Sequence, residues 1–165
     1  MTKKDTRTRR RRLKDGYHTL KQQHQSSCGQ TCLAMLTGLS YNDVIQLYDE
    51  KVRSIKKRLR SFSKQYYSSI KELKTLLHVI DPTLSLTYKR FTSWQNLLQQ
   101  PCRAILVTSP EKYSRHALIF VNSKTQDGEL NAKIIDPSDG LVTLFDNCRP
   151  SKEINIVRYW LLKKS

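Results

Sequence analysis

Three residues have the types and the chain order expected for a thiol nucleophile, its base and an orienting acid: Cys28, His116 and Asp136. Cys28 precedes Gly29 and a predicted helix, so its sulfur would lie near unpaired backbone N–H groups and the positive end of the helix dipole. That position lowers the pKa of a thiol. A nucleophilic thiol also needs a base that holds its proton and a third group that fixes the base. The three residues therefore predict nucleophilic attack at an acyl carbon.

The positions of His116 and Asp136 allow this arrangement. His116 opens a strongly apolar run, and Asp136 closes a second one. If these runs are antiparallel neighbours, both residues lie near one end of the sheet, where Asp136 would accept a hydrogen bond from His116. Two structural interpretations stay open: His116 as a packed strand-end histidine, and Asp136-Pro137 as an ordinary turn. Asp139 is the alternative acid.

Acyl transfer also needs donors aimed at the oxyanion of the tetrahedral intermediate. The backbone N–H of Cys28 is one candidate. The side-chain amide of Gln22, six residues upstream, is the second, with Gln23 and Gln25 as alternatives. The other histidines, His18, His24 and His78, are assigned to structure or solvent.

The other cysteines, Cys32, Cys102 and Cys148, are expected to be small buried hydrophobic residues. Cys28 and Cys32 stand four residues apart, but no second Cys or His pair at ligand spacing accompanies them. Four-ligand structural zinc is therefore not expected. The four cysteines show no repeated spacing, so they do not indicate a disulfide scaffold. No metal and no cofactor is predicted.

The first half of the chain predicts helices. One covers residues 30–36 and ends near Gly38, and Ser40 caps the next. A third, from Val52 to Tyr66, has an apolar stripe and a basic outer face. A fourth follows a capping box formed by Ser69 and Glu72 and ends at Asp81-Pro82.

The second half predicts strands, because apolar residues there alternate or form short runs between turn signals. A short helix after Thr92 or Ser93 interrupts them. The predicted strands are 84–88, 103–108, 116–122, 132–135, 141–145 and 154–162. Helices followed by consecutive strands predict an α+β fold, with N-terminal helices packed on a C-terminal antiparallel sheet.

The charge is strongly positive, since the 165 residues include 30 Lys and Arg against 14 Asp and Glu, a net +16. Residues 1–14 alone carry eight Lys or Arg and one Asp. Residues 1–16 are therefore predicted to be a basic disordered arm, and 17–165 a single domain. Such charge favours an anionic partner or substrate. The candidate binding residues are Arg9, Arg10, Arg11, Arg12, Lys56, Lys57, Arg58 and Arg60.

No apolar run approaches the roughly 18 to 20 residues that a membrane-spanning helix needs. The basic N-terminus is not followed by the apolar segment of a secretory signal. The expected location is the cytoplasm, or the cytoplasm of a target cell after delivery as part of a longer protein.

The motif around the cysteine closely resembles that of the papain-like, double-glycine leader peptidases that process bacteriocins. The residues that carry the resemblance are Gln22, Cys28-Gly29, Cys32-Leu33-Ala34-Met35-Leu36, His116, and Asp136-Pro137 with Gly140. The resemblance spans roughly residues 20 to 145. It implies a papain-like fold, with Cys28 as nucleophile, His116 as general acid and base, Asp136 as orienting acid and Gln22 as oxyanion-hole amide.

Three functions are consistent with these observations. The first is a papain-like cysteine peptidase that cleaves an amide bond of a peptide or protein through an acyl-enzyme at Cys28. The second is a toxin or effector domain that uses the same site on an RNA-linked substrate, such as tRNA, or on an acidic protein. An acidic immunity protein would then be a natural partner. The third is a nucleic-acid-binding module on a degenerate peptidase scaffold.

Overall fold

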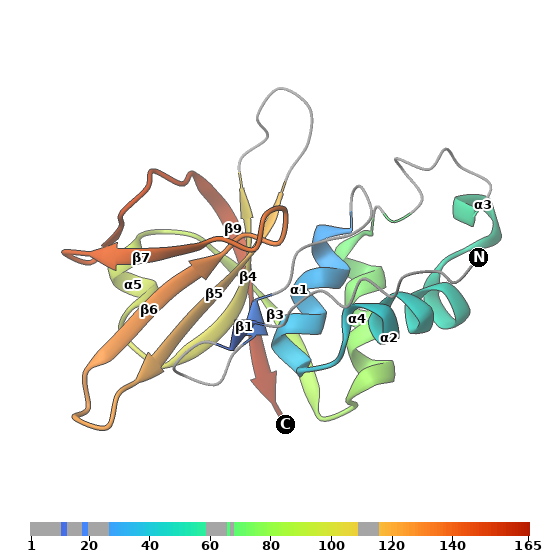
Figure 1. Ribbon diagram of the computed structural model, residues 1–165, viewed down its shortest axis with the longest axis horizontal. Coiled ribbons are helices and arrows are strands. Elements are labelled where there is room, and N and C mark those ends of the chain that lie inside the picture. The colour runs from blue at the N-terminus through green and yellow to red at the C-terminus, as the bar shows by residue number, and fades with distance from the viewer. Residues whose placement is uncertain (1–10, 13–17, 20–26, 59–65, 67, 109–115) are drawn as a thin grey trace.

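The computed structural model describes residues 11–12, 18–19, 27–58, 66, 68–108 and 116–165 (Figure 1). Helices come first in the chain and pack on a C-terminal antiparallel sheet, which confirms the predicted α+β class. The helices are α1 (Cys28–Thr37), α2 (Tyr41–Leu47), the π-helical η1 (Tyr48–Val52), α3 (Ile55–Arg58), α4 (Ile70–Ile80) and α5 (Trp94–Leu97). The strands are β1 (Arg11–Arg12), β2 (His18–Thr19), β3 (Leu84–Arg90), β4 (Cys102–Thr108), β5 (Ala117–Lys124), β6 (Leu130–Ile135), β7 (Val142–Asp146), β8 (Arg149–Pro150) and β9 (Ile156–Lys164).

The helix ends follow local signals in the sequence. Gly38 ends α1 with a φ of 76°, a conformation that glycine adopts without strain. The Ser40 side chain accepts the N–H of Asp43 at the start of α2. Ser69 and Glu72 form both hydrogen bonds of the predicted capping box of α4. None of these described helices is long and apolar enough to cross a membrane.

The structure contradicts the start and the apolar stripe of the helix predicted from Val52 to Tyr66, although α3 lies within that segment. Arg53 is extended and ends η1, and α3 is described from Ile55 to Arg58, with residues 59–65 outside the described residues. Arg53 packs inward, because it pairs with Asp49 at 3.1 Å and its guanidinium carbon lies 4.9 Å from the centroid of the Tyr66 ring. Ile55 is instead 74% exposed. The contacts of Arg53 with Asp49 and Tyr66 therefore decide which side chains point inward here, and the apolar periodicity of the sequence does not.

The main sheet has the strand order β3-β9-β4-β5-β6-β7-β8, and all neighbouring strands are antiparallel. Its inner strands are covered on both faces. Ile105, Ile119 and Ile135 pack with α1, α2 and α4 on one face. Leu106, Phe120 and Ile134 pack on the other face, where α5 lies. Burial on both faces explains why these strands are continuous apolar runs in the sequence.

The N-terminal segment contributes a small second sheet, in which β1 pairs with β2. Arg11 and Arg12 of the predicted arm therefore form a strand. Residues 1–10 and 13–16 lie outside the described residues, so the disorder of the arm and the boundary at residue 17 stay predictions.

Close packing at Gly29 ties α1 to the segment that leads into α4. A Cβ atom at Gly29 would lie 2.7 Å from Oγ of Ser68 and 2.9 Å from Cδ1 of Leu73. We expect Gly29→Ala to lower the free energy of unfolding by about 1–3 kcal/mol, as other overpacked sites do. Urea denaturation monitored by circular dichroism measures this loss.

The same measurement in a Leu73→Ala background is the control. Removing the Leu73 methyl groups makes room for the new Cβ, so Gly29→Ala should then cost at least about 0.5 kcal/mol less. Strictly additive losses would contradict steric contact with Leu73 as the cause.

Candidate active site

Cys28 is the first residue of α1, and the residue before it is held by two helices. The buried side chain of Ser27 accepts a hydrogen bond from the Tyr41 hydroxyl of α2 at 2.9 Å. The Ser27 carbonyl accepts the N–H and the hydroxyl of Thr31, at 2.9 and 2.8 Å. Cys28 in turn receives a hydrogen bond from the backbone N–H of Ala117. The thiol therefore lies where the start of α1 meets the start of β5.

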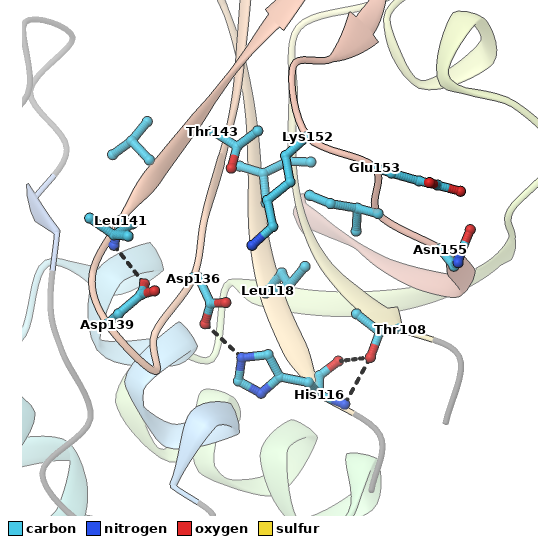
Figure 2. A pocket seen from close by; sticks show the side chains of 13 residues that line it. Thr108, His116, Leu118, Asp136, Asp139, Leu141, Thr143, Lys152, Glu153 and Asn155 are labelled. Carbon is cyan, nitrogen blue, oxygen red and sulfur yellow. Dashed lines mark hydrogen bonds and ion pairs between the residues drawn. The ribbon is translucent and has the colours of Figure 1, made fainter. Parts of the chain in front are cut away.

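His116 directly precedes β5, and Thr108 at the end of β4 holds its backbone (Figure 2). The N–H of Thr108 donates to the carbonyl of His116 at 3.0 Å. The N–H of His116 donates to Oγ1 of Thr108 at 3.1 Å. These bonds fix the backbone from which the imidazole projects toward Cys28 and Asp136.

Asp136 directly follows β6, and its Oδ1 lies 2.6 Å from Nε2 of His116. The register explains this proximity. Ile119 of β5 is opposite Ile135 of β6, so the next pair places Leu118 opposite Asp136. His116 is two residues before Leu118 and shares its face of the sheet, in diagonal contact with Asp136.

The turn after β6 fixes the carboxylate of Asp136. Its Oδ1 also accepts the N–H and the hydroxyl of Ser138, at 2.8 and 2.7 Å. The N–H of Gly140 closes the turn on the Asp136 carbonyl at 2.7 Å. Asp139, the alternative acid, instead accepts the N–H of Leu141 at 2.9 Å. Asp136 is thus both a turn residue and the partner of His116.

The charges of the three side chains support one another. Burial opposes ionisation of Cys28. Its pKa is nevertheless lower than the ordinary 9.0, because His116 donates a hydrogen bond to the thiolate and contributes its positive charge. The backbone N–H groups of Ala117 and Gly29 lower it further. Burial likewise opposes the charged form of His116, yet hydrogen bonds and charge interactions with Asp136 and Cys28 raise its pKa to about 10. Asp136 is partly buried, but its hydrogen bonds from His116 and Ser138 lower its pKa to about 2. Between these two pKa values His116 is an imidazolium and Asp136 a carboxylate, and the lowered pKa of Cys28 favours its thiolate.

The other three cysteines differ from Cys28. Burial, with the charges of Cys28 and Asp136, raises the pKa of Cys32 well above 9.0. Burial raises the pKa of Cys102 to about 11. Cys148, expected to be buried, is exposed with a φ of 63°, because it lies in the tight turn between β7 and β8. Only Cys28 combines a lowered pKa with a histidine partner.

Two cavities meet at His116. A cavity of about 310 Å³ lies on the helix side, where Cys28 and Gly29 face Trp160 of β9. A second cavity, of about 420 Å³, lies between the turn after Asp136 and residues 152–155. Figure 2 shows the Lys152 side chain extending into this second space. His116 thus lines both cavities, and Cys28 lines the cavity on the helix side.

The structure leaves several predicted site residues untested. Gln22, Gln23 and Gln25 lie outside the described residues, so the oxyanion-hole assignment stays a prediction. The same holds for Arg9, Arg10 and Arg60, and for the side chains of Arg11, Arg12, Lys56 and Lys57. Arg58 is described, and its guanidinium donates to the Asp49 carbonyl.

Comparisons with known proteins do not add to the site. The chain matches no protein-family model, and no curated protein matches its sequence. Within the described ranges, no group of three or more His, Cys, Asp or Glu side chains is placed to hold a metal ion.

Two residues that position the site were not found from the sequence. Ser27 and Thr108 act through backbone and hydroxyl contacts between segments distant in the chain. Neither belongs to a local pattern, since serine and threonine are common at helix starts and strand ends. Only the tertiary contacts reveal their role.

The pKa shifts predict how alkylation of Cys28 by iodoacetamide depends on pH. In the wild type the alkylation rate should stay high to a pH below 9.0, and fall when acid protonates the thiolate. His116→Ala removes the hydrogen bond and charge that lower the pKa, while burial remains. The rate profile should therefore shift to alkaline pH, which mass spectrometry of the labelled peptides measures.

The exposed Cys148 is the internal control, because its labelling should not depend on residue 116. Identical profiles for Cys28 in the two proteins would contradict an ion pair with His116.

Proposed function

We propose that the protein is a cysteine hydrolase of the papain-like type, which cleaves an amide bond of a peptide or protein through an acyl-enzyme at Cys28. The observation that carries the proposal is the chain of contacts from the Cys28 thiol through the His116 ring to Asp136. These residues come from α1, the start of β5 and the end of β6, and their charged forms stabilise one another.

The first half of the reaction uses both nitrogens of His116. Nε2 is held by Asp136, so Nδ1 is the nitrogen that carries the proton for Cys28. The Cys28 thiolate attacks the carbonyl carbon and the carbonyl electron pair moves to oxygen. When the intermediate collapses, the C–N bond breaks and Nδ1 donates its proton to the leaving amine.

The second half releases the acyl group. Neutral His116 takes a proton from water, whose oxygen attacks the acyl carbon. The C–S bond then breaks, which restores the Cys28 thiolate and the imidazolium and frees the carboxylic acid. The backbone N–H of Cys28 lies in the first turn of α1, where helix N–H groups lack intrahelical acceptors, and it is the nearest candidate donor to the oxyanion.

The peptidase proposal uses the described contacts more fully than the alternatives do. A nucleic-acid function would rest on basic side chains, but Arg53 pairs with Asp49 and Arg58 donates to the Asp49 carbonyl. These two side chains therefore make contacts within the helical layer. The nucleic-acid-binding module therefore remains an alternative without a described contact in its favour, whereas the effector function shares the Cys28–His116–Asp136 contacts and differs in its substrate.

Cleavage of a synthetic peptide mixture, followed by mass spectrometry, tests the proposal. Cys28→Ala should abolish cleavage, and His116→Ala should lower kcat/KM by about 10²- to 10⁴-fold, the usual contribution of a general acid and base. Cys148→Ala, which changes an exposed cysteine outside both cavities, should keep wild-type activity.

Cleavage that survives Cys28→Ala would contradict the proposed chemistry. RNA binding at low salt that is equal in the wild type and Cys28→Ala, without peptide cleavage by either, would favour the nucleic-acid-binding module.

A further inference from the structure

The cavity on the helix side of Cys28 has mostly apolar walls. Ile70 and Leu73 contribute from α4, Val107 from β4 and Trp160 from β9. None of the described residues that line it is an acid. Apart from His116, its one cationic side chain is Arg158. A full positive charge in such a cavity is expensive without a partner, because apolar walls solvate it poorly.

The sheet register directs Arg158 into this cavity. Arg158 is opposite Val107 of β4, and Trp160, two residues later in β9, is opposite Ile105. Residues two apart in a strand share a face, and Ile105 and Trp160 pack in the core on the helix side. Arg158 therefore projects on the same side of the sheet as Cys28.

The guanidinium of Arg158 lies against an aromatic ring, and its buried Nε has no hydrogen-bond partner among the described residues. Its central carbon lies 5.4 Å from the centroid of the Trp160 ring, which is a cation–π contact. Its Nε is the buried donor that lacks a hydrogen-bond partner within the part of the chain that the structure describes. Within the part of the chain that the structure describes, no carboxylate lies at ion-pair distance from Arg158.

We infer that Arg158 is a specificity residue that binds a carboxylate of the substrate beside the scissile bond. The planar fork of a guanidinium fits a carboxylate in two parallel hydrogen bonds, and the Trp160 ring presents that fork to the cavity. This inference rests on the proposed function, since it assigns a substrate group to the same site. The carboxylate belongs either to an acidic side chain or to the C-terminus of a peptide.

Alkylation of Cys28 by matched iodoacetyl probes tests the inference without a known substrate. Iodoacetyl-aspartic acid α-amide carries a side-chain carboxylate, and iodoacetyl-asparagine carries an α-carboxylate. Iodoacetyl-asparagine amide is neutral and nearly the same size. The alkylation rate with an anionic probe, divided by the rate with the neutral probe, measures carboxylate binding. The anionic probe that reacts faster shows whether the bound carboxylate is that of a side chain or of a C-terminus.

We expect Arg158→Gln to lower this ratio at least about ten-fold, because a charge-assisted hydrogen bond is lost. Arg158→Lys, which keeps the charge but loses the fork, should give an intermediate ratio. Arg149→Gln removes the same charge from an exposed position on β8 outside this cavity, and should keep the wild-type ratio. Because each ratio compares two probes on one variant, general changes in folding or in thiol reactivity cancel.

The outcomes separate the two proposals. Rapid alkylation of Cys28 with the same ratio in the wild type and Arg158→Gln overturns the role of Arg158 alone. Alkylation of Cys28 no faster than that of Cys148 overturns the proposed function, and the inference with it. Protection of Cys28 by inorganic phosphate but not by acetate overturns the carboxylate assignment, and identifies a phosphate-binding site instead.

Discussion

The contact between the N-terminal end of α1 and the first residues of β5 decides whether the thiol and the imidazole meet. Cys28 belongs to the helical layer, whereas His116 and Asp136 belong to the sheet. The helices and the sheet share one core, in which Cys32 and Leu33 of α1 pack with Ile119 of β5. Hydrogen bonds with charged partners weaken steeply when they lengthen. The core between the layers is therefore needed for the Cys28–His116 contact as well as for stability.

Much of the fold was predictable because its signals are local. The caps at Ser40 and Ser69 and the stop at Gly38 act within a few residues of chain. Continuous apolar runs identified β4 and β5, because both faces of these strands are covered. The placement of His116 and Asp136 at one sheet end followed from simple antiparallel pairing, and Asp136 both begins a turn and contacts His116.

What the sequence did not reveal depends on contacts between distant segments. Arg53 points inward because it pairs with Asp49 and contacts the Tyr66 ring. The periodicity of the segment around Arg53 does not predict these contacts. Arg158 was one basic residue within a predicted strand, and the pattern did not tell which face it would occupy. Its neighbours in space, Trp160 and Val107, are known only from the register of β9 on β4.

If the protein forms the proposed acyl-enzyme, the position of His116 between two cavities influences which nucleophile releases the acyl group. If the two halves of a cleaved chain occupy opposite cavities, the amine half departs while the acyl half stays anchored to sulfur. The cavity that the amine half leaves then admits the nucleophile that is more abundant or that binds there more tightly. Water completes hydrolysis, whereas a second amine regenerates an amide bond on a different partner. The nucleophile that enters this cavity, rather than the Cys28–His116 pair, would thus decide between hydrolysis of the acyl-enzyme and formation of a new amide bond.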